Sequence, residues 1–352
     1  MIALTKYSNM DRFNMDLRSD TVTKPTPGML EAMMNASVGD DVFDEDPTVK
    51  ALETKVAHLF NKDAGIFCPS GTMTNQIGVK VNTSPQDQVI CDKRSQVYHY
   101  EGGGLAFNSL VSVRLLDGDR GRISASDVGA NINPDNIHFP VSKLVLLENT
   151  INRAGGSYYT LPQVNEIAAV ATSHHLKMHL DGARLFNALA VTNESTTEWG
   201  QLFNTISICL SKGLGAPVGS VLVGDIETIQ SAKRVRKVLG GAMRQAGYLA
   251  AAGIYALDHH IESLAKDNQR AQQLGQILTS LSFVRNVYPI DTNIVIFELH
   301  DTIVPEDFLE QLESKGIGAL SFGGQLIRLV THREITDEMI DLFEQVTKGL
   351  YR

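Results

Sequence analysis

A single lysine, Lys212, lies between an apolar run and a glycine-rich loop in the stretch ICLSKGLGAPVG, where few sequence neighbours could pair with its charge. Earlier in the chain, MHLDGARLFNA places Asp181 at the end of another apolar run. Ligands of open α/β sheets bind beyond the carboxyl ends of strands, so this acid and this lysine could contact one ligand. The simpler alternatives are a solvated loop lysine and a local ion pair between Asp181 and Arg184.

Two further motifs could bind a phosphate. CPSGTMTN (residues 68–75) is a turn of small residues that runs into a helical pattern, and GGAMRQAG contains Arg244. Backbone N–H groups at a helix start, together with the Thr72 hydroxyl, can bind an anion, although an ordinary helix N-cap has the same sequence. Arg244 could equally be an ordinary helix arginine.

An anion site, a carboxylate and a lysine together are what pyridoxal phosphate requires. The lysine forms a Schiff base, the carboxylate keeps the pyridine nitrogen protonated, and the turn holds the phosphate. The sequence contains neither GxGxxG nor GxxxxGK[ST], so the combination favours pyridoxal phosphate over a nucleotide.

The elements that must position these residues follow from hydrophobic patterning. Short apolar segments bounded by polar residues or glycine predict strands over residues 88–92, 112–116, 143–149, 176–181, 205–210 and 219–224. Helical periodicity between them predicts an α/β fold with a mainly parallel sheet covered on both faces. After two helical stretches near 244–281, the pattern predicts a smaller α+β domain. We therefore expect a large domain over 1–264, including the N-terminal segment, and a small domain over 265–352.

Composition excludes several classes of function. The 352 residues carry 31 Lys and Arg against 40 Asp and Glu, a net charge of −9, and KRVRK (residues 233–237) is typical of one helix face, so we expect no nucleic-acid partner. The longest apolar stretch is too short to span a membrane, and the N-terminus lacks the features of a signal peptide. Three widely spaced cysteines match neither a disulfide framework nor a metal site. We expect a cytoplasmic protein without a bound metal.

With its motifs in this order, the sequence resembles the threonine aldolases of the β-eliminating lyase group, which are fold-type I pyridoxal-phosphate enzymes. The resemblance runs from DLRSDTVTKPT (residues 16–26) through HLDGARLFNA and CLSKGLGAPVGSVLVG to IRLVTH (residues 327–332). It implies a mainly parallel seven-stranded sheet. It also implies a homotetramer, a dimer of dimers, with active sites at subunit interfaces.

The resemblance also implies roles for individual residues. Lys212 would hold the cofactor as a Schiff base, and Asp181 would pair with its pyridinium. The residues that would hold the cofactor phosphate are Gly71, Thr72, Ser211 and Arg244, the last of which could reach across a subunit boundary. The residues that would bind the carboxylate of an amino-acid substrate are Ser19, Arg184 and Arg328, and Arg184 would also contact the cofactor.

Two positions depart from the family pattern. Gln96 stands where the family usually has a histidine stacked on the cofactor ring, near the substrate hydroxyl, and Ile151 replaces the histidine of an ENTHN motif. Glutamine can lie on a ring and form hydrogen bonds, but it cannot accept a proton as imidazole does. His138, in NIHFP, matches a family histidine near the substrate. It is therefore the leading candidate for the catalytic base, with a structural loop histidine as the alternative.

The activity that the resemblance implies is retro-aldol cleavage of L-threonine or L-allo-threonine, and of related β-hydroxy-α-amino acids, to glycine and an aldehyde. Two alternatives are β-elimination or transamination on the same scaffold. A third is a protein that binds pyridoxal phosphate without turnover. Lys212, Asp181 and the two arginines at 184 and 328 argue against this third alternative.

Overall fold

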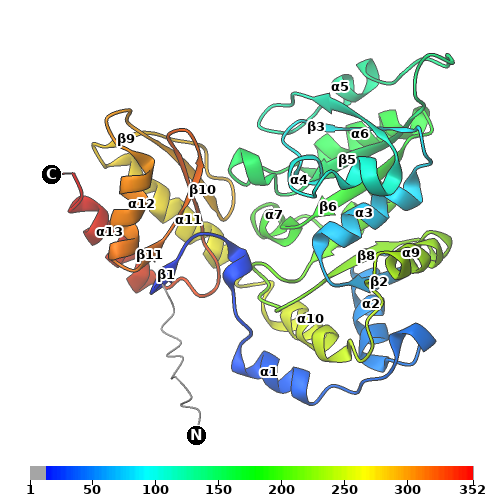
Figure 1. Cartoon of the computed structure of the whole chain (residues 1–352), viewed down its shortest axis with the longest axis horizontal. Coiled ribbons are helices and arrows are strands. Elements are labelled where there is room, and N and C mark those ends of the chain that lie inside the picture. Colours follow the sequence, from blue (N-terminus) through cyan, green and yellow to red (C-terminus); the bar gives the residue numbers. More distant parts are fainter. Residues whose placement is uncertain (1–12, 352) are drawn as a thin grey trace, which may run out of the picture.

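A seven-stranded sheet forms the centre of the larger lobe in the computed structural model, which describes residues 13–351 (Figure 1). The strands lie in the order β2-β8-β7-β6-β5-β3-β4, and all run parallel except β8, which is antiparallel to both neighbours. Their bounds are β2 (Ala64–Cys68), β3 (Gln88–Asp92), β4 (Ser112–Leu116), β5 (Ser142–Glu148), β6 (Lys177–Gly182), β7 (Thr205–Cys209) and β8 (Ser220–Gly224). The predicted α/β class and the mainly parallel sheet are confirmed.

All six predicted strands form, each within one residue of its predicted ends. The one strand of this sheet that the apolar pattern does not predict is β2, an edge strand with the sequence AGIFC. The near-continuous apolar runs reflect packing on both sides of the sheet. In β8, Leu222 lies in a cluster with residues of α3 and α9, whereas Val221 and Val223 belong to the core on the other face, where α2 packs against the strand.

The helices begin with the caps that their sequences offer. Ser70 caps α3 by accepting a hydrogen bond from the Met73 N–H at 3.2 Å, and Asp46 caps α2 in the same way through Thr48 and Val49. The helices of the larger lobe are α1 (Pro27–Met34), α2 (Pro47–Leu59), α3 (Gly71–Asn82), α4 (Gln96–His99), α5 (Ala125–Ala130), α6 (Leu161–Ser173), α7 (Leu185–Thr192), α8 (Thr196–Leu202), α9 (Ile226–Val238) and α10 (Gly247–His259). Short helical turns are η1 (Asp20–Val22), η2 (Asp41–Phe43), η3 (Leu105–Ser109) and η4 (Asn152–Ala154).

The smaller lobe contains an antiparallel sheet in the order β12-β13-β10-β9 (Figure 1). Its elements are α11 (Leu264–Thr279), β9 (Val284–Val287), β10 (Ile294–Leu299), α12 (Pro305–Ser314), β11 (Ile317–Gly318), β12 (Leu320–Gly323), β13 (Leu326–Val330) and α13 (Asp337–Lys348). The smaller unit has the predicted α+β character. The boundary after residue 264 stays a prediction.

The N-terminal segment differs from expectation. Strand β1 (Met15–Asp16) pairs in parallel with β11, and Met15 and Leu17 are buried in the core of the smaller lobe. The expectation that this segment belongs to the large domain is therefore wrong for these residues, because their apolar side chains are buried among those of α11 to α13. The signal-peptide interpretation rests largely on residues 1–12, which lie outside the described residues.

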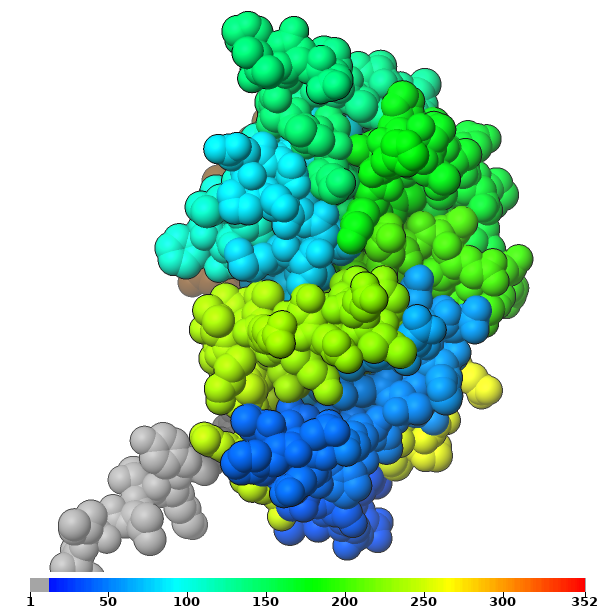
Figure 2. Space-filling model, turned by 90° about the vertical axis from the view of Figure 1, so that its right-hand side faces the viewer, coloured from blue at the N-terminus to red at the C-terminus, as the bar shows by residue number. Residues whose placement is uncertain are grey.

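The basic cluster KRVRK lies on α9, which crosses the face of the molecule shown in Figure 2, in yellow-green. One of its members is not solvated. Arg236 is buried, pairs with Asp41 at 2.6 Å and donates a hydrogen bond to the Phe67 carbonyl at 2.7 Å. Over residues 13–351, no helix combines the length and the apolar character needed to cross a membrane.

Candidate active site

Three strands end at one edge of the large sheet and deliver charged residues there. β6 ends next to Asp181, β5 ends at Glu148, and β7 is followed by Ser211 and Lys212. Glu148 and Asp181 are direct partners across the β5–β6 pair. Parallel strands share a carboxyl edge, so the structure brings Lys212 and Asp181 to the same edge, as their positions in the sequence predicted.

Asp181 is fully buried but only half satisfied. Its Oδ1 accepts a hydrogen bond from the Ala183 N–H at 3.1 Å, whereas its buried Oδ2 has no partner within hydrogen-bond distance among residues 13–351. Burial raises the pKa of Asp181, and the positive charge of Lys212 acts in the opposite direction. An orphaned buried carboxylate oxygen is costly, so this atom is suited to a ligand N–H donor.

Lys212 is partly buried, and its ammonium group forms no hydrogen bond or ion pair with any residue of the described chain. Its backbone carbonyl accepts a hydrogen bond from the Thr23 hydroxyl at 2.9 Å. Its charge nevertheless acts electrostatically on three buried carboxyl groups, those of Asp20, Glu148 and Asp181. The sequence showed few local partners, but the fold supplies distant ones without saturating the amine.

A buried polar network supports Asp181 from within the sheet. His179, two residues earlier on β6, contacts the Thr205 hydroxyl through Nδ1 at 2.8 Å and the Asn75 amide oxygen through Nε2 at 3.2 Å. An amide oxygen can only accept, so Nε2 carries the proton. Burial lowers the pKa of His179 to about 3, which keeps the ring neutral. The period of two in MHLD was the available signal that His179 shares a strand face with Asp181.

Two more buried carboxyl groups, which the sequence patterns do not single out, adjoin Asp181. Glu148 accepts hydrogen bonds from the backbone N–H groups of Gln96 and Asn152 at 2.8 and 2.9 Å. Glu101 accepts hydrogen bonds from the side-chain amides of Asn75 and Gln76 at 2.9 and 2.6 Å. Burial, reinforced by the charge of Asp181, raises the pKa of Glu148 to about 7 and that of Glu101 to about 8.

The two predicted carboxylate-binding arginines have different environments. Arg184 forms a buried, bidentate ion pair with Asp20, at 2.6 Å through Nε and 2.7 Å through Nη2. The alternative of a local pair between Arg184 and Asp181 is therefore wrong, because Asp20 takes that place. Burial alone would raise the pKa of Asp20, but the charge and hydrogen bonds of Arg184 hold it at about 2.

Arg328, on β13, has no acidic partner within ion-pair distance in the described chain. Its Nη1 donates to the Asn152 Oδ1 atom and its Nη2 to the Arg18 carbonyl, both at 3.0 Å, while its buried Nε has no hydrogen-bond partner among the residues that the structure describes. Burial, followed by repulsion from Arg184, lowers the pKa of Arg328 to about 10. Such a cation is suited to bind an anionic ligand.

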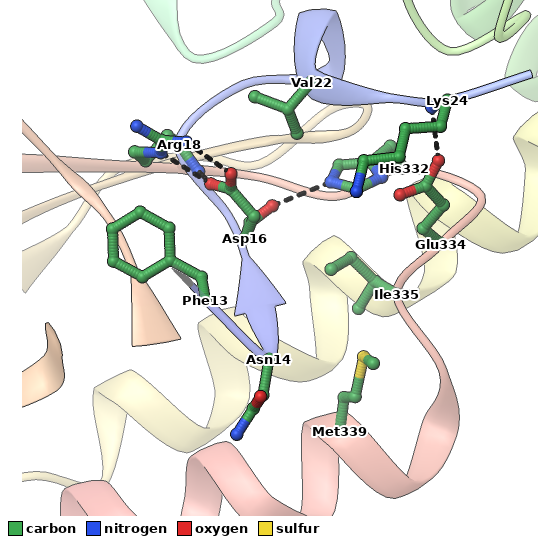
Figure 3. Close-up of a pocket in the computed structure, with 10 residues that line it drawn as sticks. All are labelled: Phe13, Asn14, Asp16, Arg18, Val22, Lys24, His332, Glu334, Ile335 and Met339. Atoms are coloured by element: carbon green, nitrogen blue, oxygen red, sulfur yellow. Dashed lines mark hydrogen bonds and ion pairs between the residues drawn. The ribbon is translucent and has the colours of Figure 1, made fainter. Parts of the chain in front are cut away.

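Ser19 directly precedes Asp20, the ion-pair partner of Arg184. Its hydroxyl is partly buried and accepts hydrogen bonds from the N–H and hydroxyl groups of Thr21 at 3.2 and 2.8 Å. The segment that carries Ser19 is held beside the smaller lobe, at a cavity of about 280 Å³ (Figure 3). There the His332 ring contacts the Asp16 carbonyl at 2.7 Å, and the Asp16 carboxylate binds Arg18. The two terminal motifs of the resemblance thus contact each other.

The predicted phosphate end is only partly assembled within one chain. Gly71 and the exposed Thr72 form the first turn of α3, and Ser211 lies beyond the end of β7. The Ser220 hydroxyl is buried near Gly71 and has no hydrogen-bond partner within residues 13–351. Arg244 instead points to solvent, and its Nε lies 3.7 Å from the Asp40 carboxylate. It forms no hydrogen bond with this turn in the described chain.

Of the two departures from the family pattern, one lies at the site. Gln96 begins α4 just after β3, and its side-chain oxygen is 3.5 Å from the Asn152 amide nitrogen. Ile151 is buried within the main hydrophobic core. His138 lies elsewhere, in the exposed loop that leads into the amino end of β5. A strand of this length spans roughly 20 Å, so this chain does not bring its own His138 to Lys212.

The sequence is similar to proteins of one family. A family model described as Beta-eliminating lyase matches residues 16–302. A low-specificity L-threonine aldolase from Escherichia coli is 38% identical over 327 residues, covering 93% of this chain and 96% of the relative. Low-specificity L-threonine aldolase 1 from Arabidopsis thaliana is 37% identical over 330 residues, covering 92% of this chain and 92% of the relative.

Solved structures agree on the fold. Threonine aldolase from Leishmania major matches with a TM-score of 0.82 at 22% identity, covering 96% of this chain and 99% of that one. A serine palmitoyltransferase from Sphingomonas wittichii matches with a TM-score of 0.75 at 16% identity, covering 95% and 86%. The architecture is that of the fold-type I pyridoxal-phosphate enzymes. Since the family model spans most of the sequence, the chain belongs to the beta-eliminating lyase family, and its relatives there include threonine aldolases.

Proposed function

We propose that this protein cleaves L-threonine, L-allo-threonine and related β-hydroxy-α-amino acids to glycine and an aldehyde, which is acetaldehyde for the first two substrates. Arg328 carries the proposal. It is a cation with no acidic partner in the described chain, and it accompanies a sheet edge that offers a free amine and an orphaned carboxylate oxygen. The carboxylate of an amino acid fits this cation. The names of the relatives support the choice of amino acid.

Pyridoxal phosphate is the cofactor of this family, and the residues present fit it. The buried Asp181 Oδ2 atom offers the acceptor that a protonated pyridine nitrogen needs, and Lys212 offers an amino group that has no hydrogen-bond partner in the described chain. The first turn of α3, with Gly71 and Thr72, offers backbone N–H groups for the phosphate beside Ser211. When bound, the cofactor supplies an electron sink for the negative charge left on Cα when the Cα–Cβ bond breaks.

The protein's own residues would orient the substrate. Arg328 and Ser19 would hold its carboxylate and so determine which bond at Cα lies perpendicular to the conjugated ring, which selects the bond that breaks. Asp20 already occupies two nitrogens of Arg184, so Arg184 would contribute mainly positive potential and its remaining nitrogen. Gln96 would contact the ring or the substrate hydroxyl without exchanging a proton.

We also propose a cytoplasmic homotetramer, a dimer of dimers in which His138 of one subunit serves as the base for the β-hydroxyl group bound at another. His138 is exposed, and its neighbour Ile137 is 98% exposed, an apolar surface that assembly would cover. Phe107, 84% exposed, offers a second such surface. Arg244 would likewise reach the phosphate of a neighbouring subunit.

A product assay with the cofactor-loaded protein tests the activity. L-threonine, L-allo-threonine, phenylserine, serine and tryptophan would be supplied separately, and aldehyde, glycine, pyruvate, indole, ammonia and keto acids would be measured. We expect equal amounts of aldehyde and glycine from the first two substrates. β-Elimination would instead release ammonia together with pyruvate, 2-oxobutanoate or indole, whereas transamination would give a keto acid without free ammonia. The absence of any product would indicate a binding protein. Lys212→Ala should lose both the visible absorption of the bound cofactor and the activity.

A further inference from the structure

Among the three buried acids Asp181, Glu148 and Glu101, Glu148 connects two segments of the candidate active site. Each of its carboxylate oxygens accepts a hydrogen bond from a different segment. Its Oε2 accepts the Gln96 N–H at 2.8 Å, and its Oε1 accepts the Asn152 N–H at 2.9 Å. The first segment follows β3, and the second follows β5. The Glu148 side chain is buried, and Glu148 itself is the last residue of β5, paired with β6.

Asn152 carries this connection onward to the substrate-binding arginine. Its Oδ1 accepts a hydrogen bond from Arg328 Nη1 at 3.0 Å, and its Nδ2 points to the Gln96 side-chain oxygen at 3.5 Å. The guanidinium of Arg328 also lies over the Phe322 ring, 5.4 Å from its centroid. Arg328 comes from the smaller lobe, so Asn152 is its polar contact with the larger lobe's carboxyl edge.

We propose that Glu148 is a positioning residue for the substrate carboxylate, acting through Asn152 on Arg328 while holding Gln96 in the same frame. The proposal rests on the proposed function, because it assigns the anion bound by Arg328 to an amino acid. Glu148 ends β5, the strand that pairs with the Asp181 strand β6, so it would also determine where Arg328 lies relative to Asp181. One side chain would thereby set the distance between the cofactor and the group that binds the substrate carboxylate.

The two backbone contacts favour the ionised form of Glu148, against the effect of its burial. Each oxygen of Glu148 accepts one backbone N–H, and an ionised carboxylate has only acceptors to present. In a Glu148→Gln variant, one N–H would face an amide NH₂ group and lose its acceptor. If the Gln96 N–H loses its acceptor, the start of α4 should shift. If the Asn152 N–H loses its acceptor, the Asn152 side chain that accepts a hydrogen bond from Arg328 should shift. If Glu148 were purely structural, replacing it would lower the free energy of unfolding, and its effect on ligand binding would not depend on Asn152.

A double-mutant cycle in glycine affinity separates these roles. The dissociation constant of glycine for the cofactor-loaded protein would be measured by calorimetry for wild type, Glu148→Gln, Asn152→Ala and the double variant. We expect each single change to weaken glycine binding about tenfold, the loss of one hydrogen bond at a charged site. The double variant should be hardly weaker than the single ones, because both changes interrupt one path.

Glu101 provides the matched control. It is a second buried carboxyl group beside Asp181, but it binds the amides of Asn75 and Gln76 and has no bond to Asn152 or Gln96. In a Glu101→Gln/Asn152→Ala double variant, the fold-change in the dissociation constant of glycine should equal the product of the fold-changes in the two single variants. Multiplicative losses for Glu148→Gln and Asn152→Ala would overturn the positioning role.

The outcomes also separate this proposal from the proposed function. If wild type does not bind glycine, the proposed function fails. If it binds glycine but Asn152→Ala leaves the dissociation constant unchanged, only the path from Glu148 to Arg328 fails. That single variant keeps the test valid should Glu148→Gln not fold, since it removes the contact with Arg328 and leaves the Glu148 carboxylate paired.

Discussion

Replacing Arg328 by methionine should leave the fold nearly as stable as wild type while removing most of the activity on L-threonine. Arg328 donates two hydrogen bonds to protein acceptors but has a buried, unpartnered Nε and no acidic partner in the described chain. Arg184 is the natural comparison, because its guanidinium is buried against the Asp20 carboxylate in a bidentate pair. Arg184 therefore has an anionic partner within the described chain, whereas Arg328 has none there.

The expected magnitudes follow from these environments. The gap between the ordinary arginine pKa of 12.5 and about 10 means that the fold disfavours the Arg328 cation by about 3 kcal/mol. A cation whose folded-state pKa is lowered carries this cost at every pH below the folded value, including neutral pH. Loss of two hydrogen bonds from a charged donor, each at the lower end of their usual range or about 1.5 kcal/mol, offsets the gain, so the free energy of unfolding of Arg328→Met should lie within about 1 kcal/mol of the wild-type value. Arg184→Met should cost about 3 to 5 kcal/mol, because it leaves Asp20 buried and uncompensated.

Urea unfolding of the cofactor-free protein at neutral pH measures the two stabilities, and aldehyde release from L-threonine measures the activity. The carboxylate of the substrate would lose its charged partner in Arg328→Met, which should lower kcat/KM at least about a hundredfold. If Arg328→Met destabilised the fold as much as Arg184→Met, Arg328 would be a structural residue. An unchanged kcat/KM would equally refute the assignment.

Three further predictions concern the base, the ring face and the pH dependence of stability. Co-expression of Lys212→Ala and His138→Asn chains should restore about a quarter of wild-type aldehyde release if subunits share sites, whereas no recovery would argue against a base supplied by another subunit. Gln96→His should alter the ratio of L-threonine to L-allo-threonine cleavage rates, because imidazole can exchange a proton with the β-hydroxyl; an unchanged ratio would show that residue 96 does not face that group. Burial raises the pKa of Glu53 to about 7, so the folded state retains a proton that the unfolded state has released, and the free energy of unfolding should fall as pH rises from about 5 to 7. Urea unfolding over that range should show a flatter slope for Glu53→Gln.

The sheet could be predicted from the sequence because burial on both faces makes each strand a near-continuous apolar run. The exception, β2, begins with alanine and glycine, lies at the edge of the sheet and pairs only with β8. The N-terminal segment was misassigned for another reason. Its strand β1 pairs with residues about 300 positions later, and no local pattern carries that information.

The site was predictable to the extent that strand ends determine it. Lys212 and Asp181 follow apolar runs, so the rule for parallel sheets placed them at one edge. The partner of Arg184 could not be found in this way, because Asp20 is 164 residues away and the nearby Asp181 was the obvious alternative. Glu148 and Glu101 escaped because each is one of 40 acidic residues, and only the fold distinguishes buried acids from solvated ones.

The two departures from the family pattern also acquire different weights from the structure. Ile151 is 2% exposed and lies in the hydrophobic core, where a side-chain base would have no access to a substrate. Gln96 begins α4, where Glu148 accepts its backbone N–H, and its side chain approaches Asn152, the residue that contacts Arg328. A change at position 151 therefore alters packing, whereas a change at position 96 alters the surroundings of the bound amino acid. If the substrate preference of this protein differs from that of its relatives, the physical cause should be sought at Gln96.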